Sequence, residues 1–395
     1  MTGLADRSME IVLRNRVLFG VGAVERLPEA VAAAGGSRVF IVTDPGVRAS
    51  GVIERVLAVL AAADVEVETT VFSEVEPNPG TSTVERGAAA LRTFGLGGTV
   101  VVPVGGGSSM DTAKALDLRA ANDLPVWQLE YDGPDLAPGR PVVAVPTTAG
   151  TGAGTNSFAV ITDEAAGRKG YIGHPSLLPV ATILDPALTI GLPPAATAAT
   201  GIDAMTHSLE SLLSANPNPF AEAIALGVIR TIGAWLRRAV ADGTDLEARS
   251  HMLMASHLAG VGQASGTGVG LVHALGHSIG TRGAVAHGTA LATVLPEVLH
   301  FYLGTRDPEL ALVGIAFGVA TSAEPESTAA AVAIGAIEAL LRDVDQRPSL
   351  RRLGLADATA LDQLVTDTLD DAAIRNSPRL PSAIEARAIL EAVAG

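Results

Sequence analysis

The chain has 395 residues, more than one hydrophobic core usually serves, so we expect two domains. Hydrophobic residues make up 48% of it and charged residues 17%, and there are 43 glycines, which is typical of a compact α/β enzyme and excludes a disordered or fibrous chain. The net charge of -15 argues against a nucleic-acid partner, because phosphate backbones are bound by clustered Lys and Arg; without cysteine, disulfides and thiolate chemistry are also excluded.

The N-terminal stretch MTGLADRSMEIVLRN carries charges where a signal peptide would have its apolar core. The chain also has no run of 18 or more apolar residues, the length that a transmembrane helix needs. We therefore expect a cytoplasmic protein without a membrane partner.

The first half alternates short apolar strands with helical segments. An extended segment ends at Phe19-Gly20, and a helix over 23–34 stops at Gly35-Gly36. Strands are predicted at 39–43, 65–72, 99–104, 141–146, 157–162 and 181–184, and helices at 52–63, at 83–93 and through Asp111 and Lys114. This βαβ alternation predicts a Rossmann-like α/β dinucleotide-binding domain over residues 1–190.

The strand at 99–104 runs directly into Gly105-Gly106-Gly107-Ser108-Ser109. A glycine turn between a strand and a helix lets the backbone approach a phosphate, and the first N–H groups of the helix face the anion. Ser108 or Ser109 can cap that helix or donate to a phosphate oxygen. Such glycines also serve as plain tight turns, but their place at the end of a buried strand favours the phosphate site.

Polar residues also follow two other predicted strands of the same sheet. Asp44 follows the strand at 39–43 and can accept from an adenosine ribose hydroxyl; an acid there would repel a 2′-phosphate, so NAD is favoured over NADP. Thr147, Thr148 and Thr151 follow the strand at 141–146 and either donate to the cofactor or form a turn.

From Leu192-Pro193-Pro194 onward the sequence becomes helical. We expect helices at 195–214, 219–242, 246–264, 269–281, 289–303, 309–317, 324–344, 358–371 and 381–393. Residues 191–395 are therefore predicted to form an all-helical domain for metal and substrate.

One aspartate and several histidines have the spacing of metal ligands. Asp203 and His207 are four residues apart, as are His273 and His277, so each pair shares one helical face, and His287 follows in a loop. Three imidazoles and a carboxylate suit Zn, Fe(II), Co or Ni better than Ca or Mg.

An isolated histidine is more often a core or surface group than a ligand. We therefore interpret the other four histidines as structural, because none of them has an aspartate or a second histidine four residues away: His174, His251, His257 and His300.

Five motifs give the chain a family resemblance: PVGGGSSMDTAKA, AVPTTAGTG, ILDPALT, LPPAATAATGIDAMTHSLES and LVHALGHSIGTRGAVAHG. Together they resemble the iron-containing (group III) alcohol dehydrogenase family, over nearly the whole chain. The glycine motif is shared with dehydroquinate synthase-like and glycerol dehydrogenase relatives, whereas the two histidine motifs are specific. The resemblance implies an N-terminal dinucleotide-binding α/β domain and a C-terminal all-helical domain with a cleft between them.

Carried over by position, the resemblance implies that four residues hold the metal: Asp203, His207, His273 and His287. It places His277 beside them without being a ligand, and we interpret His277 as the proton relay. It implies that the cofactor is lined by Asp44, Asn78, Gly105, Gly106, Gly107, Ser108, Thr147, Thr148, Thr151 and Lys169. The sequence departs from the family pattern at one position: Gly154 stands where family members often have the glutamate of TGSEVT. This difference affects the expected nicotinamide-binding part of the site and the substrate range.

The predicted function is hydride transfer between NAD(H) and a small alcohol, aldehyde or ketone at a metal centre, with Fe(II) expected from the resemblance and Zn(II) possible from the ligands. The alternatives are a maleylacetate reductase-like or other specialised reductase of the same fold, and a catalytically silent NAD- and metal-binding or filament-forming module. A lyase like dehydroquinate synthase is disfavoured by the few clustered Lys and Arg. The resemblance also implies that an N-terminal edge strand at 11–19 pairs across a dimer axis, giving a homodimer or higher homo-oligomer.

Overall fold

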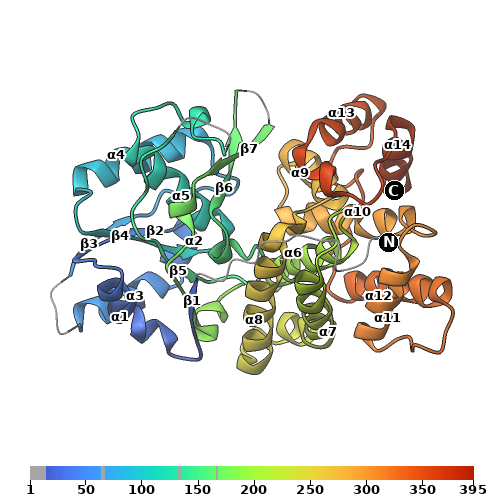
Figure 1. Cartoon of the computed structure of the whole chain (residues 1–395), viewed down its shortest axis with the longest axis horizontal. Coiled ribbons are helices and arrows are strands. Elements are labelled where there is room, and N and C mark those ends of the chain that lie inside the picture. Colours follow the sequence, from blue (N-terminus) through green and yellow to red (C-terminus); the bar gives the residue numbers. More distant parts are fainter. Residues whose placement is uncertain (1–14, 64–66, 132–134, 166–167) are drawn as a thin grey trace. The chain divides into compact units, whose positions relative to one another are not determined.

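The computed structural model describes residues 15–63, 67–131, 135–165 and 168–395. These residues form two compact units, shown in Figure 1. Of the described residues, the α/β unit contains those from Asn15 to Pro193 together with Asp242–His257, and the helical unit contains Pro194–Ala241 and Leu258–Gly395. The expected boundary at residues 190 and 191 marks where the chain changes character, but it does not include the return of 242–257 to the first unit.

The α/β unit is built on a six-stranded sheet in which every pair of neighbours is parallel. In sheet order its strands are β1 (Arg16–Phe19), β8 (Ala181–Leu184), β5 (Val143–Pro146), β4 (Thr99–Gly105), β2 (Arg38–Val42) and β3 (Glu68–Phe72). The chain adds β3 on one side of β2 and then crosses to add β4 on the other. The carboxyl ends of β2 and β4 therefore flank a topological switch point, where open α/β sheets bind ligands.

Apolar residues on successive positions of β2 serve two different cores. Val39 and Ile41 face the core that contains Ile53 of α3, whereas Phe40 and Val42 face the core that contains Leu116 of α5. A parallel sheet must be covered on both faces, so its strands are continuously apolar instead of alternating with polar residues. This burial accounts for the uninterrupted apolar runs at 39–42 and 99–104 that predicted the sheet.

The helices of this unit lie close to their predicted positions. They are α1 (Leu27–Ala33), α2 (Pro45–Ala49), α3 (Val52–Ala61), α4 (Thr81–Phe94) and α5 (Gly107–Ala121), with a 3-10 turn at Ala23–Arg26 before α1. The predicted helix at 23–34 is therefore a 3-10 turn followed by an α-helix. The short α2 was not predicted as a helix; the Asp44 carboxylate starts it by accepting from the Val47 N–H at 2.9 Å.

A separate two-stranded antiparallel sheet is formed by β6 (Phe158–Asp163) and β7 (Arg168–Gly173). Sequence patterning predicted β6 but not β7. The β7 sequence, RKGYIG, begins with two basic residues and contains two glycines, so it lacks the apolar run that predicted the other strands.

The helical unit contains nearly all the helices that follow β8, and each lies within two residues of its predicted bounds. They are α6 (Pro194–Leu213), α7 (Pro219–Ala241), α8 (Leu246–Gly262), α9 (Leu271–Gly283), α10 (His287–Phe301), α11 (Asp307–Phe317), α12 (Glu326–Asp343), α13 (Ala358–Asp370) and α14 (Ala383–Ala392). Helix α8 is the exception in its packing, since its first part belongs to the α/β unit. The observed architecture, a parallel α/β unit and an all-helical unit, agrees with the predicted fold class.

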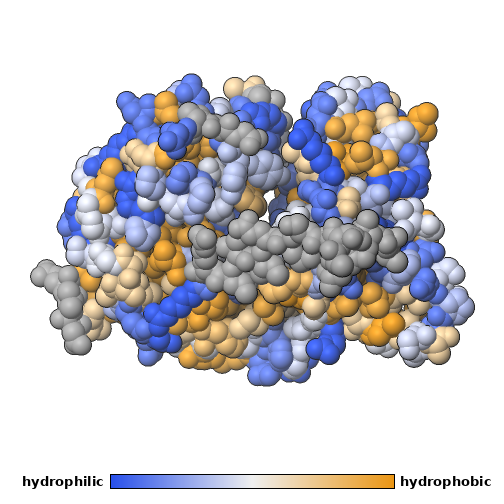
Figure 2. Space-filling model, viewed as in Figure 1, coloured by the Kyte–Doolittle hydropathy of each residue, from blue (hydrophilic) through white to orange (hydrophobic). Residues whose placement is uncertain are grey.

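Within the described residues, α7 alone has the length and composition of a membrane-spanning helix, with a mean hydropathy of 1.3. Core helices of globular proteins also meet this criterion. Helix α7 packs against α6 and α11 and buries Val228, Ile232 and Leu236, while Glu222 and Arg230 interrupt its sequence. On the face seen in Figure 2, hydrophilic and hydrophobic side chains are interspersed over both units. Helix α7 thus packs one face against its own unit, and 33% of its apolar window is buried.

Candidate metal centre and cofactor site

Three helices of the helical unit bring one aspartate and three histidines together. Asp203 and His207 lie one turn apart on α6, and His273 lies in the first turn of α9. His287 was expected in a loop, but it is the first residue of α10. This position is set by the helix boundary, which sequence patterning locates only to within a few residues.

The four side chains converge on one carboxylate oxygen. The Nε2 atoms of His207, His273 and His287 lie 3.6, 3.8 and 3.6 Å from Oδ1 of Asp203. The rings of His207 and His273 are stacked with centroids 4.8 Å apart. These nitrogen–oxygen distances are too long for hydrogen bonds. They are close to the roughly 3.4 Å that separates two ligands, each about 2.1 Å from a shared tetrahedral ion.

The cluster also fits a cation in its chemistry. Oδ1 of Asp203 and Nε2 of His273 are buried, and neither has a hydrogen-bond partner among the described residues. Buried polar atoms are normally paired, so two such atoms facing one another call for a ligand between them. One ligand atom each of Asp203, His273 and His287 lies within 4.8 Å of the other two, and Nε2 of His207 lies 3.6 Å from the same aspartate oxygen. Three imidazoles and one carboxylate match a borderline divalent metal; Asp203, His273 and His287 would hold it, with His207 as the predicted fourth ligand.

Glu210, which sequence reasoning missed, orients one of these histidines. It lies two turns after Asp203 on the same buried face of α6, and its Oε2 is 2.6 Å from Nδ1 of His273. Its Oε1 accepts from the backbone N–H of Val272 at 2.7 Å, at the start of α9. With Nδ1–H donated to Glu210, the lone pair of Nε2 points at Asp203, the arrangement that metal-ligating histidines usually show.

Burial would raise the pKa of the Glu210 carboxyl, but His273 and the backbone N–H groups outweigh it and lower that pKa. Glu210 is therefore ionised at neutral pH. The spacing of 203, 207 and 210 along one helical face was the available signal for its role.

His277 lies beside the cluster and has a carboxylate partner of its own. Its Nδ1 is 2.8 Å from Oδ2 of Asp371, and its ring stacks on that of His287 with centroids 5.5 Å apart. Asp371 also starts the 3-10 turn at Ala372–Asn376 by accepting from the N–H of Ala373. Burial alone would raise the pKa of Asp371, but the hydrogen bond and charge of His277 lower it.

The glycine loop of the α/β unit, residues Gly105, Gly106 and Gly107, lies at the carboxyl end of β4, as predicted. Gly106 is the N-cap of α5, and no side chain caps this helix, so its first N–H groups point outward. A Cβ on Gly107 would lie 2.6 Å from the methyl carbon of Thr151, closer than two carbons can approach. Residues 147–151, which follow β5 and form the threonine loop, thus pack directly on the glycine backbone.

Asp44 faces this loop across the switch point. Ser109 was expected to cap α5 or to donate to a phosphate; its hydroxyl lies 3.3 Å from Oδ2 of Asp44 and donates to it instead. Ser108 is partly exposed in the first turn of α5, and Thr147 donates its N–H to the carbonyl of Gly105 at 3.0 Å. The structure therefore gathers these predicted cofactor residues at the ends of β2, β4 and β5.

Two of the predicted cofactor residues meet at a different point of the unit. Nζ of Lys169, on β7, donates to Oδ1 of Asn78 at 3.1 Å. Asn78 has a positive φ of 51°, which asparagine tolerates better than most residues. Its carbonyl accepts from the hydroxyl of Thr162 on β6.

Lys114 on α5 is fully buried and was not singled out from the sequence. Its ammonium donates to the carbonyl of Ala153 at 2.6 Å, to Oδ1 of Asn156 at 2.7 Å and to the carbonyl of Phe158 at 3.0 Å. Burial lowers the pKa of Lys114, opposed by the charge of Asp111. Lys114 thus ties the segment after the threonine loop to the helix that begins at the glycine loop.

Comparisons with known proteins identify the family. Residues 14–186 match the family described as iron-containing alcohol dehydrogenase, and residues 197–394 match the C-terminal part of the Fe-containing alcohol dehydrogenase family. The chain belongs to the iron-containing alcohol dehydrogenase family. The resemblance seen in the sequence motifs is thereby confirmed, and the chain is a metal-dependent, nicotinamide-dependent alcohol oxidoreductase.

Relatives within this family match along most of the chain. A choline dehydrogenase of Bacillus subtilis is 36% identical over 366 residues, covering 92% of this chain and 89% of the relative. A 1,3-propanediol dehydrogenase of Klebsiella pneumoniae is 36% identical over 359 residues, covering 90% and 91%. The crystal structure of a 1,3-propanediol oxidoreductase is 34% identical with a TM-score of 0.93, covering 98% of this chain and 100% of that one.

Proposed function

We propose that this protein interconverts a small alcohol and its aldehyde or ketone with NAD(H), using Fe(II) held by Asp203, His207, His273 and His287. The observation that carries the proposal is the convergence of three imidazole nitrogens within 3.8 Å of one aspartate oxygen. Zn(II) fits the same ligands, and the preference for Fe(II) comes from the family. The names of its relatives, including dehydrogenases of methanol, choline and 1,3-propanediol, support a small alcohol substrate.

A metal ion held by the four proposed ligands would supply a Lewis acid for a hydroxyl or carbonyl oxygen, and a nicotinamide cofactor would supply or accept the hydride. The surrounding residues prepare the site. Glu210 fixes the ring and tautomer of His273. His277, oriented by Asp371, is close enough to the cluster to pass a proton between the substrate oxygen and solvent.

Asp44 supports NAD over NADP. Its carboxylate is held at the end of β2 by the Val47 N–H and the Ser109 hydroxyl. In this orientation it can accept from ribose hydroxyls and would repel a 2′-phosphate. Asn78, Lys169 and the glycine and threonine loops complete the proposed cofactor site.

We also propose that the enzyme is cytoplasmic and that it forms a homodimer or higher homo-oligomer. The observation that supports the oligomer is β1, an edge strand of the described sheet whose Val17 and Phe19 are 37% and 46% exposed. An apolar edge with unpaired backbone groups favours pairing with a second copy. The predicted part of this strand at 11–14 lies outside the described residues.

The test is NADH oxidation by the purified protein against a panel of short aldehydes, with Fe(II), with Zn(II) and with a chelator. We expect activity that the chelator abolishes and that metal restores, with NADH preferred over NADPH. Full activity in a chelator-treated sample whose metal content is shown to be negligible would overturn the metal assignment. A preference for NADPH would overturn the role of Asp44.

A further inference from the structure

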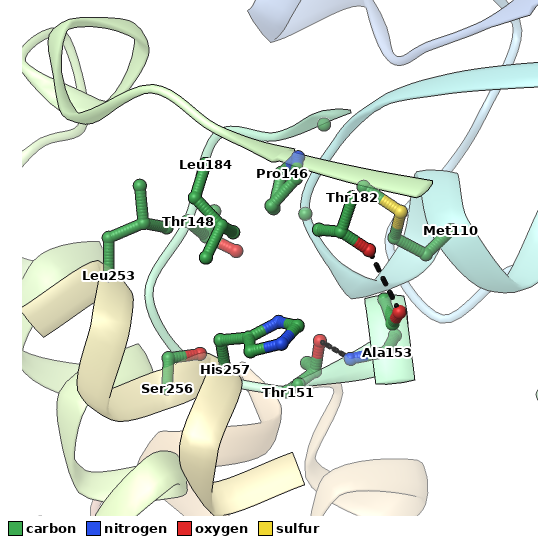
Figure 3. A pocket seen from close by; sticks show the side chains of 14 residues that line it. Met110, Pro146, Thr148, Thr151, Ala153, Thr182, Leu184, Leu253, Ser256 and His257 are labelled. Carbon is green, nitrogen blue, oxygen red and sulfur yellow. Dashed lines mark hydrogen bonds between the residues drawn. The ribbon is translucent and has the colours of Figure 1, made fainter. Parts of the chain in front are cut away.

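His257 occupies an unusual place among the histidines that lack metal-ligand spacing. It lies on the part of α8 that packs with the α/β unit, and its side chain is only 7% exposed. Figure 3 shows its ring pointing into a pocket at the carboxyl ends of β4, β5 and β8. The sequence alone gave it no role beyond packing.

The imidazole of His257 has no hydrogen-bond or ion-pair partner among the described residues, and burial alone lowers its pKa to about 4. It is therefore neutral at physiological pH, with one N–H donor and one acceptor nitrogen. The nitrogens of a buried imidazole normally have hydrogen-bond partners. The ring of His257 instead faces the pocket. This combination indicates a ligand that can exchange hydrogen bonds with a neutral imidazole.

The position of the pocket along the sheet indicates which part of a dinucleotide reaches it. The strand order places β4 between β2, which carries Asp44, and β5 with β8, which supply Pro146 and Leu184 to the pocket. The pocket starts at Gly105 and Gly106 of the glycine loop and extends away from β2. With the adenosine ribose at Asp44 and the pyrophosphate at the glycine loop, the remaining half of the dinucleotide extends towards β5 and β8.

The lining of the pocket agrees with this direction. Its walls combine apolar residues with polar side chains, a mixture that is typical of ligand pockets. The polar side chains are those of Thr148, Thr151, Thr182, Ser256 and His257. Gly154 forms part of the wall, and a Cβ there would lie 3.1 Å from the Thr182 hydroxyl oxygen, so a larger side chain would crowd the pocket. This is the position where family members often have glutamate.

We propose that His257 binds the nicotinamide riboside half of the cofactor by a hydrogen bond to a ribose hydroxyl or to the carboxamide. The inference rests on the proposed use of NAD. A neutral imidazole suits the task because a charged ring beside the site would repel the positive charge of oxidised nicotinamide. His257 is thus a cofactor-binding residue, contributed by a helix that follows the helices α6 and α7 in the chain.

The test compares three ligands of increasing length, ADP, ADP-ribose and NAD+, by calorimetric titration of the metal-loaded protein at pH 7.5. His257→Leu should weaken NAD+ binding roughly fivefold to tenfold, the typical loss for one hydrogen bond between neutral groups, and leave ADP binding unchanged. A matching loss for ADP-ribose assigns the bond to the ribose, and an unchanged ADP-ribose affinity assigns it to the carboxamide. His257→Gln, which keeps a donor and an acceptor, should recover part of the affinity.

His251→Leu is the matched control, because His251 lies on the same helix but is exposed and paired with Glu247. It should leave all three affinities unchanged. A second measurement does not depend on the leucine variant being stable: the imidazole ¹⁵N resonance of His257 is followed in the wild-type protein. NAD+ should shift this resonance and ADP should not. The resonance is assigned by its disappearance in His257→Gln.

Unchanged NAD+ affinity in His257→Leu, or an equal loss for ADP, would overturn the inference while leaving the proposed function intact. The absence of a resonance shift with NAD+ would do the same. Failure of the wild-type protein to bind either NAD+ or ADP would overturn the proposed function and this inference with it.

Discussion

The metal cluster and the glycine loop differ in what they present to a ligand. The cluster presents side-chain donors from α6, α9 and α10, each oriented by packing or by a carboxylate. The glycine loop at Gly105, Gly106 and Gly107 presents backbone N–H groups and the space left by missing side chains. The first site depends on particular functional groups, the second on the shape of the backbone.

This difference predicts how each site responds to substitution. Removing a donor from the cluster removes part of the coordination itself, so the loss should be nearly complete. Adding a carbon to the glycine loop shifts the neighbouring Thr151 without removing any N–H group, so the loss should be graded. Five substitutions at the two sites and their supporting residues test this contrast, from the largest expected effect to the smallest.

His207→Ala should abolish metal retention and lower kcat/KM on the order of a thousandfold or more, because the Lewis acid contributes several kcal/mol to the transition state. Metal content per chain, measured by mass spectrometry after dialysis, should fall in parallel. The control is His300→Ala, at an exposed histidine near the opposite end of α10 from His287. Retention of one metal per chain by His207→Ala would break the assignment of four ligands.

His277→Ala should keep the metal and lower kcat on the order of a hundredfold, the usual contribution of a positioned acid or base. Asp371→Asn should lower kcat by less, because it disturbs only the orientation of His277. Metal content and kcat measured on the same samples check the division of roles. Equal metal loss in His277→Ala and His273→Ala would contradict it.

Glu210→Gln should weaken metal binding about tenfold to hundredfold, the usual effect of removing the partner that orients a ligating histidine. The glutamine can still accept from the N–H of Val272, so the start of α9 should persist. Competition with a chelator of known affinity measures the change. An unchanged metal affinity would show that His273 is held by packing alone.

Gly107→Ala should weaken NAD+ binding roughly tenfold and destabilise the fold by about 1–3 kcal/mol, because the new Cβ overlaps Thr151. Gly97→Ala is the matched control, since a Cβ there meets no atom within 4 Å. Calorimetric titration and urea unfolding measure the two effects. If Gly107→Ala abolished NAD+ binding as completely as His207→Ala abolishes metal binding, the contrast between the two sites would be removed.

Much of the architecture was predictable because it depends on short-range patterns. The apolar runs of β2 and β4 predicted buried parallel strands, and the helical periods of α6 to α14 located those helices to within two residues. The four proposed metal ligands were found from i, i+4 spacing and family motifs. Strand β7 was missed because its pattern is weak, and His287 was placed in a loop although it begins α10.

The sequence by itself determined the alternation of strands and helices, the kinds of ligand available and the family. Only the tertiary structure decided which carboxylate serves which histidine, since Glu210 and His273 are 63 residues apart and His277 and Asp371 are 94 apart. The tertiary structure alone also decided that Ser109 turns to Asp44 and that His257 faces a pocket. Sequence periodicity encodes which face of an element is buried, but partners on remote faces meet only when the whole core packs.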